Sequence, residues 1–291
     1  MIEVAGLSRR FGDRVALSRV DLRVEAGAVV AVLGANGAGK STLVKCLAGV
    51  LVGSGTVRVA GLDPWSQRAA AALRLGVMFA HRGSLWPDLS AAEGLRLSAA
   101  LYRADRARIE VLADRLGVAD RLGALVRTLS LGERVRLELV GALLHRPPVL
   151  LFDEPTLGLD PAIRTVVRRV LREAVEDGAA LLLTSHDLGE VAQLADRVVV
   201  LRDGVVATAG TLAELRARAG GARRIVVTAP GPLDDAVVGA DRRLGSDSFE
   251  LAFDGPSGPV VGALLARLPG GCDLAIRESP LDEVLAPLYS R

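Results

Sequence analysis

The chain has 291 residues, half of them hydrophobic, and a formal net charge of +2 at pH 7. It is long enough to bury a substantial core, and its intermixed charges, with no stretch rich in basic residues alone, argue against nucleic-acid binding. The longest apolar runs fall far short of the roughly 20 residues that span a bilayer, and the first residues lack the features of a secretory signal, so we expect a cytosolic protein.

The pattern along the chain predicts an α/β protein with a helical insertion and a small appendage. Residues 2–33 form short β-like runs, whereas leucines at helical spacing dominate from about 64 to 145. Strands and helices then alternate to about residue 215, which predicts a parallel sheet with crossover helices. Shorter strand-like and helical runs over 216–291 indicate a small α+β unit at the C-terminal end.

A glycine-rich loop gives the strongest chemical signal in the sequence. The apolar strand VVAVL runs into GANGAGKS, and a helix follows, which is the phosphate-loop pattern in its required setting. Glycines and an asparagine let backbone N–H groups turn toward a phosphate, and the helix N-terminus adds positive potential. Lys40 suits the β- and γ-phosphates, while the hydroxyl of Ser41 suits Mg²⁺. The residues expected to bind nucleotide here are Gly34, Asn36, Gly37, Gly39, Lys40, Ser41 and Thr42.

Lysine and asparagine are concentrated at this loop. Lys40 and Lys45 are the only lysines in the chain, and Asn36 is its only asparagine. A chain that elsewhere uses arginine has kept lysine where a compact ammonium group differs in kind from a planar guanidinium. The pattern predicts a P-loop NTPase core with a β-rich N-terminal subdomain.

A second motif places two acidic residues at the end of a buried strand. The run VLLFDEPT spans residues 149–156, so Asp153 ends the strand and Glu154 follows it. Asp153 can reach the hydration shell of Mg²⁺, a cation that keeps several waters. Glu154 can hydrogen-bond an attacking water and accept its proton as a phosphoryl group leaves. On its own the run could be an ordinary acidic turn, but the phosphate loop upstream favours the catalytic interpretation.

The order of the remaining motifs identifies a family. LSLGE at residues 129–133 opens a helix, and Ser130 with Glu133 could be an ordinary capping box. However, it stands between the phosphate loop and the acidic strand, and Asp160 and His186 follow in turn. In this order the motifs resemble the ATP-binding cassette (ABC) family over nearly the whole of the first 215 residues.

The resemblance implies an ATPase subunit of an ABC transporter that uses ATP and Mg²⁺. Its ATPase domain would span 1–215, with a helical subdomain at about 80–145, and 216–291 would form an accessory domain. The subunit would lie on the inner face of the cell membrane and energise a separate transmembrane permease. Two copies, in a homodimer or a heterodimer, would face head to tail with ATP between one phosphate loop and the other chain's signature helix.

The resemblance also implies roles for individual residues. The adenine ring would stack on Phe11, and LSLGE would be the signature motif. Its Ser130 and Gly132 would bind the γ-phosphate of the ATP held by the other chain. Gly158 to Asp160 would form the D-loop, and His186 would be the switch histidine that contacts the γ-phosphate.

Two positions depart from the family pattern. In place of the usual LSGGQ, Leu131 replaces a glycine, which indicates a subgroup of exporters, and Glu133 replaces the glutamine. The Glu133 carboxylate would either add negative charge near the phosphate site or face solvent. The run LGVMFAHRGSLWPDL, which resembles exporters of drugs, polysaccharides or lipids, lacks the family's glutamine. That position falls on His81 counting backward and on Ala80 counting forward, and we prefer His81 because imidazole can hydrogen-bond.

Two other functional classes compete with a transporter subunit. ABC ATPases of DNA repair and chromosome cohesion insert a long coiled coil, and those of translation carry two cassettes, whereas this sequence shows neither feature. A nucleotide-dependent regulator without turnover is the other alternative. Measured ATPase activity would separate it from the enzyme.

Overall fold

The computed structural model describes residues 1–79, 83–185, 187–218, 223–230, 242–244, 247–253, 257–268 and 270–278. The chain divides into two compact units, Met1–Ala209 and Gly210–Arg291. Within the described ranges, no helix has the length and apolar character needed to cross a membrane.

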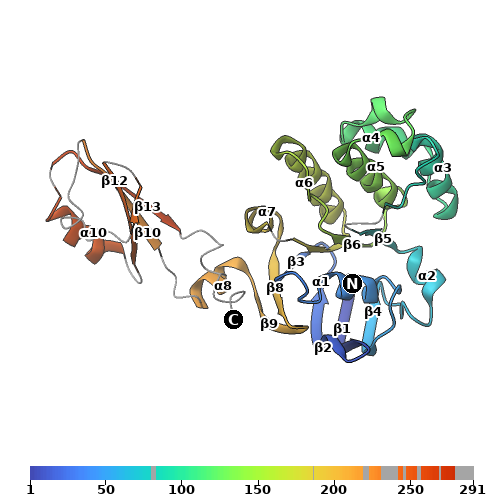
Figure 1. Ribbon diagram of the computed structural model, residues 1–291, viewed down its shortest axis with the longest axis horizontal. Helices are drawn as coiled ribbons and strands as arrows, with labels where there is room; N and C mark the ends of the chain where they lie inside the picture. Colours follow the sequence, from blue (N-terminus) through green and yellow to red (C-terminus); the bar gives the residue numbers. More distant parts are fainter. Residues whose placement is uncertain are drawn as a thin grey trace. The chain divides into compact units, whose positions relative to one another are not determined.

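A three-stranded antiparallel sheet opens the first unit (Figure 1). Its strands, in the order β2-β1-β4, are β1 (Ile2–Phe11), β2 (Arg14–Val24) and β4 (Ser54–Val59). Ile2 pairs with Val24 on one side and with Val59 on the other, and all three side chains are fully buried. Alternating apolar residues therefore give this sheet one face that packs into the core.

The central sheet has six strands in the order β5-β6-β7-β3-β8-β9. They are β5 (Leu75–Met78), β6 (Val149–Asp153), β7 (Ala180–Thr184), β3 (Val29–Leu33), β8 (Arg197–Arg202) and β9 (Val205–Gly210). The first five pair in parallel, and every residue of β3, β6 and β7 is buried. Uninterrupted apolar strands of this kind belong to sheets that are covered on both faces.

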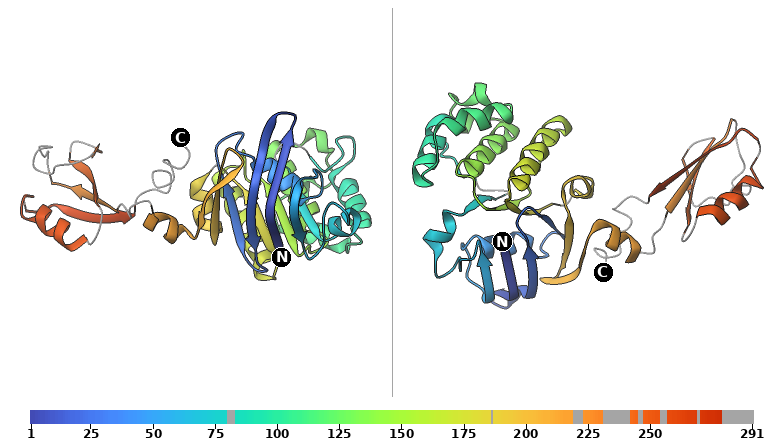
Figure 2. Two further views of the ribbon diagram at one scale, coloured as in Figure 1. Left: turned by 90° about the horizontal axis from the view of Figure 1, so that it is seen from below. Right: turned by 180° about the vertical axis from the view of Figure 1, so that it is seen from behind.

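Seven α-helices accompany these sheets among the described residues of the first unit. They are α1 (Lys40–Leu47), α2 (Arg68–Ala72), α3 (Ala91–Leu101), α4 (Ala107–Arg115), α5 (Leu131–Leu143), α6 (Pro161–Glu176) and α7 (Leu188–Leu194). Residues of α1 share one apolar core with both sheets. Figure 2 shows α3, α4 and α5 gathered on the far side of the central sheet from the antiparallel strands. The expected P-loop core with a helical insertion is confirmed.

One strand lies where the sequence predicted helix. The segment from about residue 64 was expected to be helical, yet Leu75–Met78 forms β5 and pairs in parallel with β6. Four residues are too few to show a reliable period-2 pattern, and pairing with the buried strand beside them decides the conformation. The helical insertion therefore begins after the sheet edge, with α3.

The second unit has its own small core. It contains α8 (Leu212–Arg218), β10 (Arg223–Thr228), β11 (Arg242–Arg243), β12 (Ser248–Phe253), α10 (Ser257–Leu265) and β13 (Asp273–Glu278). The strands form an antiparallel sheet in the order β11-β12-β10-β13. The buried residues of its apolar core cluster are Ile225, Val227, Phe249, Phe253 and Leu264. This is the expected α+β appendage.

Helix α5 buries a carboxylate against the segment that joins β5 to α3. Glu138 is 6% exposed, and the N–H of Ser84 donates a hydrogen bond to its carboxylate. A Cβ atom on Gly83 would lie 2.7 Å from Glu138 Oε1, so Gly83 and Ser84 pack closely on this group. Burial raises the pKa of Glu138 to about 7, although the nearby Arg134 acts in the opposite direction.

Glu138→Gln is expected to stabilise the protein at pH 8 and to lose most of this advantage at pH 5. The native state holds the Glu138 proton more tightly than the unfolded chain, so ionisation destabilises the native state as pH rises from about 4.5 to 7. The gain in the free energy of unfolding should be about 2 kcal/mol larger at pH 8 than at pH 5. Denaturant unfolding of both full chains at the two pH values measures this difference.

The control is Glu93→Gln at the exposed start of α3, where hydrogen bonds from Ser90 lower the pKa of the carboxyl group. This variant should bring no gain at pH 8. A gain from Glu138→Gln that is equal at both pH values would contradict the predicted titration.

Candidate active site

The phosphate loop is pressed between strands of two different sheets. A Cβ atom on Gly34 would lie 2.3 Å from the carbonyl oxygen of Leu201 in β8. A Cβ on Gly39, whose φ is +110°, would lie 2.6 Å from the carbonyl oxygen of Ala16 in β2. Any side chain at these two positions would collide with backbone, so only glycine allows this loop to follow β3.

Lys40 begins α1 and extends back over the loop. Its Nζ donates to the carbonyl oxygens of Gly34 at 2.7 Å and Ala35 at 3.3 Å, and the residue is 8% exposed. Gly39 at the N-cap supplies no side-chain acceptor to the first N–H groups of α1. A buried ammonium group and the positive end of a helix therefore converge on one loop, which is the arrangement that binds phosphate.

A cavity of about 350 Å³ lies beside this loop. Phe11, at the end of β1, is 45% exposed, and the guanidinium of Arg9 lies 4.7 Å from its ring centroid. Arg14, which the sequence analysis missed, donates to the carbonyl oxygen of Gly37 at 3.4 Å. Its proximity to Phe11 in the β1–β2 hairpin is the signal that could have revealed it. The lining residues are Phe11, Arg14, Ala16, Asn36, Gly37, Gly39, Lys40, Ser41, Thr42 and Glu154.

The acidic pair stands at the carboxyl end of β6. Asp153 is 3% exposed and accepts a 2.6 Å hydrogen bond from the hydroxyl of Thr184 at the end of β7. The N–H of Glu154 donates to the carbonyl oxygen and the hydroxyl of the same threonine. Glu154 has a φ of +56°, a left-handed conformation that is rare for residues other than glycine and clusters at functional sites. Glu154 lines the cavity, whereas Asp153 is buried and is not among the lining residues.

The signature motif forms a complete capping box. Ser130 is the N-cap of α5, and Glu133 Oε2 accepts from both the N–H and the hydroxyl of Ser130 at 2.9 Å. These bonds hold the pKa of Glu133 below its usual value, and Glu133 Oε1 lies 2.7 Å from the Nε of Arg121. The negative charge of Glu133, one of the two departures from the family pattern, is thus balanced within the chain.

The signature motif and the D-loop form one continuous surface. A Cβ atom on Gly158 would lie 2.7 Å from the side chain of Leu131, and one on Gly132 would lie 3.5 Å from Leu159. Asp160 is the N-cap of α6 and accepts a 3.0 Å hydrogen bond from an N–H in the first turn of that helix. Ser130, Gly132 and Asp160 do not line the cavity of their own chain.

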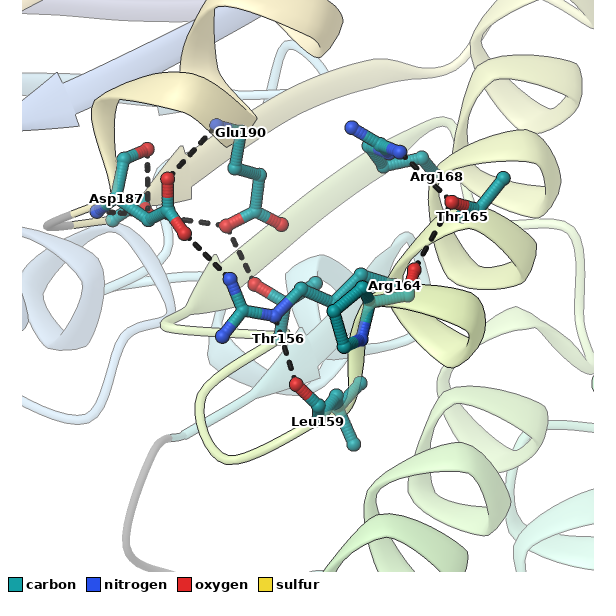
Figure 3. Close-up of polar contacts among 9 residues, drawn as sticks. Thr156, Leu159, Arg164, Thr165, Arg168, Asp187 and Glu190 are labelled. Carbon is teal, nitrogen blue, oxygen red and sulfur yellow. Dashed lines mark hydrogen bonds and ion pairs between the residues drawn. The ribbon is translucent and has the colours of Figure 1, made fainter.

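A polar network joins the D-loop to the segment that follows β7 (Figure 3). Arg164 contacts the carbonyl oxygen of Leu159 and the carboxylate of Asp187. Deeper in the protein, the hydroxyl of Thr156 donates to Glu190. Three predicted positions, Ala80, His81 and His186, lie outside the described residues, so the choice between Ala80 and His81 stays as the sequence left it.

The comparisons with known proteins decide the family. A family model described as ABC transporter matches residues 17–157. The chain is 39% identical to the daunorubicin resistance ATP-binding protein DrrA3 of Streptomyces coeruleorubidus, over 99% of this chain and 95% of the relative. It is also 36% identical to the ABC transporter ATP-binding protein NatA of Bacillus subtilis, over 74% of this chain and 91% of the relative. This chain belongs to the ABC transporter family.

Solved structures agree with this assignment to the ABC ATPases. An ATP-binding subunit of an ABC transporter, 29% identical, superposes with a TM-score of 0.70 over 75% of this chain and 92% of that one. A bacterial Atm1-family ABC exporter with ATP bound, 25% identical, gives 0.68 over 75% of this chain and 40% of that one. This ABC protein is therefore an ATP-binding and ATP-hydrolysing transporter subunit, in a family whose ATPases dimerise and work with transmembrane permeases.

Lys40→Ala is expected to weaken ATP binding by about tenfold to a hundredfold, because a hydrogen bond to a charged group contributes roughly 1.5–3 kcal/mol. Titration calorimetry with Mg·ATP measures the change. The matched control is Lys45→Ala, which removes the other lysine from the same helix at a position that does not line the cavity. Equal affinities for the two variants would contradict the role of Lys40.

Proposed function

We propose that this chain is the Mg²⁺-dependent ATPase subunit of an exporter and acts as a head-to-tail dimer on a separate membrane permease. The observation that carries the proposal is the division of the predicted site into two surfaces on one chain. Phe11, the phosphate loop and Glu154 line the cavity. Ser130 and Gly132, on the surface shared with the D-loop, do not. A second copy would bring its signature surface to this cavity and complete the site.

The dimer arrangement follows from the chemistry of the two surfaces. The cavity offers the ammonium of Lys40 and the start of α1 to one side of a triphosphate. The exposed start of α5 offers a serine hydroxyl and a second helix N-terminus, which suit the γ-phosphate from the opposite side. ATP would then hold the two copies together, and hydrolysis would release them.

Mg²⁺ fits the oxygen groups beside the phosphate loop. Ser41 lines the cavity, and the Asp153 carboxylate accepts a hydrogen bond from Thr184, so both predicted ligands carry the hard oxygen donors that this cation prefers. When bound, Mg²⁺ would neutralise charge on the β- and γ-phosphates. The buried position of Asp153 suits contact through a water molecule better than direct ligation.

The residues of the chain supply the remaining chemistry. Lys40 would exchange its loop carbonyl partners for the β- and γ-phosphate oxygens. Glu154 would accept a proton from a water molecule that attacks the γ-phosphorus, while the bond from that phosphorus to the leaving ADP oxygen breaks. The left-handed backbone of Glu154 costs about 1–3 kcal/mol, a strain typical of residues held in place for function. His186, and His81 in the family's glutamine position, remain proposed catalytic partners.

The export direction is supported by the relatives and by Leu131. The proteins DrrA3 and LnrL are named for resistance to daunorubicin and linearmycin. An importer ATPase, the ribose import protein RbsA 1 of Burkholderia thailandensis, is 40% identical but over only 70% of this chain and 42% of its own length. The match to DrrA3 extends through the second unit, which favours a drug-exporter subunit with a C-terminal accessory domain. Binding to the permease would hold the subunit at the inner membrane face.

Glu154→Gln is expected to slow hydrolysis by about a hundredfold or more while ATP binding persists, because the amide can hold water but cannot accept its proton. The variant should then accumulate as a dimer with Mg·ATP, whereas the wild type without ATP should be monomeric. Size-exclusion chromatography and phosphate release measure the two effects.

The control is Glu176→Gln at the exposed end of α6, which should hydrolyse ATP like the wild type. Monomers of the Glu154→Gln variant in the presence of Mg·ATP would contradict the dimer. Unchanged hydrolysis would contradict the role of Glu154.

A further inference from the structure

One arginine bridges two loops that are distant in the sequence. Arg164 lies in the first turn of α6, and its Nε donates to the carbonyl oxygen of Leu159 at 2.9 Å. Its Nη1 donates to Asp187 Oδ2 at 2.5 Å, as Figure 3 shows. Leu159 belongs to the D-loop, and Asp187 is the N-cap of α7. A single planar guanidinium group therefore sets the separation of these two segments.

Asp187 is itself held firmly in place. Its Oδ1 accepts a 3.0 Å hydrogen bond from the N–H of Glu190, and its own N–H donates to the Ser185 hydroxyl at 3.0 Å. The hydrogen bond from Glu190, together with Arg164, holds the pKa of Asp187 below its usual range, so this carboxylate is ionised at neutral pH. The contact with Arg164 is thus a charge-assisted hydrogen bond to an anchored partner.

A second, buried link runs parallel to the first. The Thr156 hydroxyl donates to Glu190 Oε2 at 2.5 Å, and the Ser185 hydroxyl donates to the same oxygen at 3.2 Å. All three residues are at most 4% exposed. Thr156 lies two residues after the predicted base Glu154. The segment after β6 and the segment after β7 are therefore joined by buried hydrogen bonds. The half-buried Arg164 links the D-loop to the segment after β7 by a second set of hydrogen bonds.

We propose that Arg164 is a positioning residue that couples the D-loop to Asp187 and, through it, to Ser185, the two residues that flank the predicted switch histidine in the sequence. The inference rests on the proposed function, in which the D-loop faces the second copy. Docking of the second copy against the exposed Gly158 and Asp160 of the D-loop would act through the Leu159 carbonyl oxygen and the guanidinium on Asp187, which follows the predicted switch histidine in the sequence. Hydrolysis would then reach its full rate only when the second copy is docked. Arg164 itself would not contact the substrate.

Arg168 provides a matched control on the same helix. It lies one turn beyond Arg164, is also half-buried, and its Nη2 donates to the hydroxyl of Thr165 within α6 at 3.0 Å (Figure 3). Arg168→Ala removes a guanidinium group from α6 and leaves the bridge between Leu159 and Asp187 intact. A loss that is specific to Arg164 cannot then be assigned to a general weakening of the helix.

The test compares steady-state ATP hydrolysis by full-length wild type, Arg164→Ala, Arg164→Lys, Arg168→Ala, Asp187→Asn and the Arg164→Ala/Asp187→Asn double variant. Asparagine can still cap α7, so Asp187→Asn removes charge and keeps the cap.

Arg164→Ala and Asp187→Asn should each lower kcat by about tenfold or more with KM changed by less than about threefold, because the cavity is untouched. The double variant should lose no more than either single variant. Arg164→Lys should have a kcat between those of Arg164→Ala and the wild type, since lysine keeps the positive charge but lacks the planar guanidinium that donates to both partners.

The inference would be overturned by a kcat for Arg164→Ala equal to that of Arg168→Ala, or by losses that multiply in the double variant. A loss of kcat accompanied by a melting temperature well below that of Arg168→Ala, without rescue in Arg164→Lys, would also overturn it in favour of a structural role. The Glu154→Gln variant distinguishes failure of the proposed function from failure of the coupling by Arg164. If it stays monomeric with Mg·ATP, the proposed head-to-tail dimer fails; if it forms the dimer while Arg164→Ala is not impaired in hydrolysis, only the coupling by Arg164 fails.

Discussion

The close approach of the phosphate loop to two backbone carbonyl groups is the constraint on which the rest of this structure depends. Gly34 leaves no room for a side chain before the Leu201 carbonyl in the central sheet, and Gly39 leaves none before Ala16 in the antiparallel sheet. The turn after β8 closes the same junction, because Gly204 accepts from the N–H of Ser18 and donates to the carbonyl oxygen of Ala38. The two sheets are thus fastened to each other at the loop, and the cavity forms where they meet.

Strand register places the other groups of the site around this junction. Asp153 and Thr184 are partners in the parallel pairing of β6 with β7, so the threonine hydroxyl meets the carboxylate without any further adjustment. Groups with complementary chemistry collect at the carboxyl ends of β3, β6 and β7, as expected for an open parallel sheet. The signature surface, by contrast, is built from the starts of α5 and α6, and its predicted binding residues Ser130, Gly132 and Asp160 do not line this cavity. In the proposed dimer, catalysis depends on the association of two such surfaces.

Short-range patterns explain what the sequence could predict. The glycines of the phosphate loop, the end of a buried strand at Asp153 and the cap Ser130 depend on residues within a few positions of one another, and the structure has them as expected. The groups that were missed depend on contacts between distant segments. Arg14 reaches the cavity only because a hairpin folds over the loop, and Arg164 meets Asp187 across 23 positions. No periodicity in one sequence reports such pairs.

Two helices of the helical subdomain begin with the same chemistry. Ser90 with Glu93 and Ser130 with Glu133 each form a reciprocal capping box, and in both the hydrogen bonds from serine lower the pKa of the glutamate. The second box adjoins the D-loop through Leu131, on the surface that we propose contacts the other copy. The capping box on α3 can therefore serve as an internal control for the capping box on α5. A spectroscopic signal from the box on α3 reports solvent, salt and temperature, and the difference between the two boxes isolates what nucleotide and a second copy add.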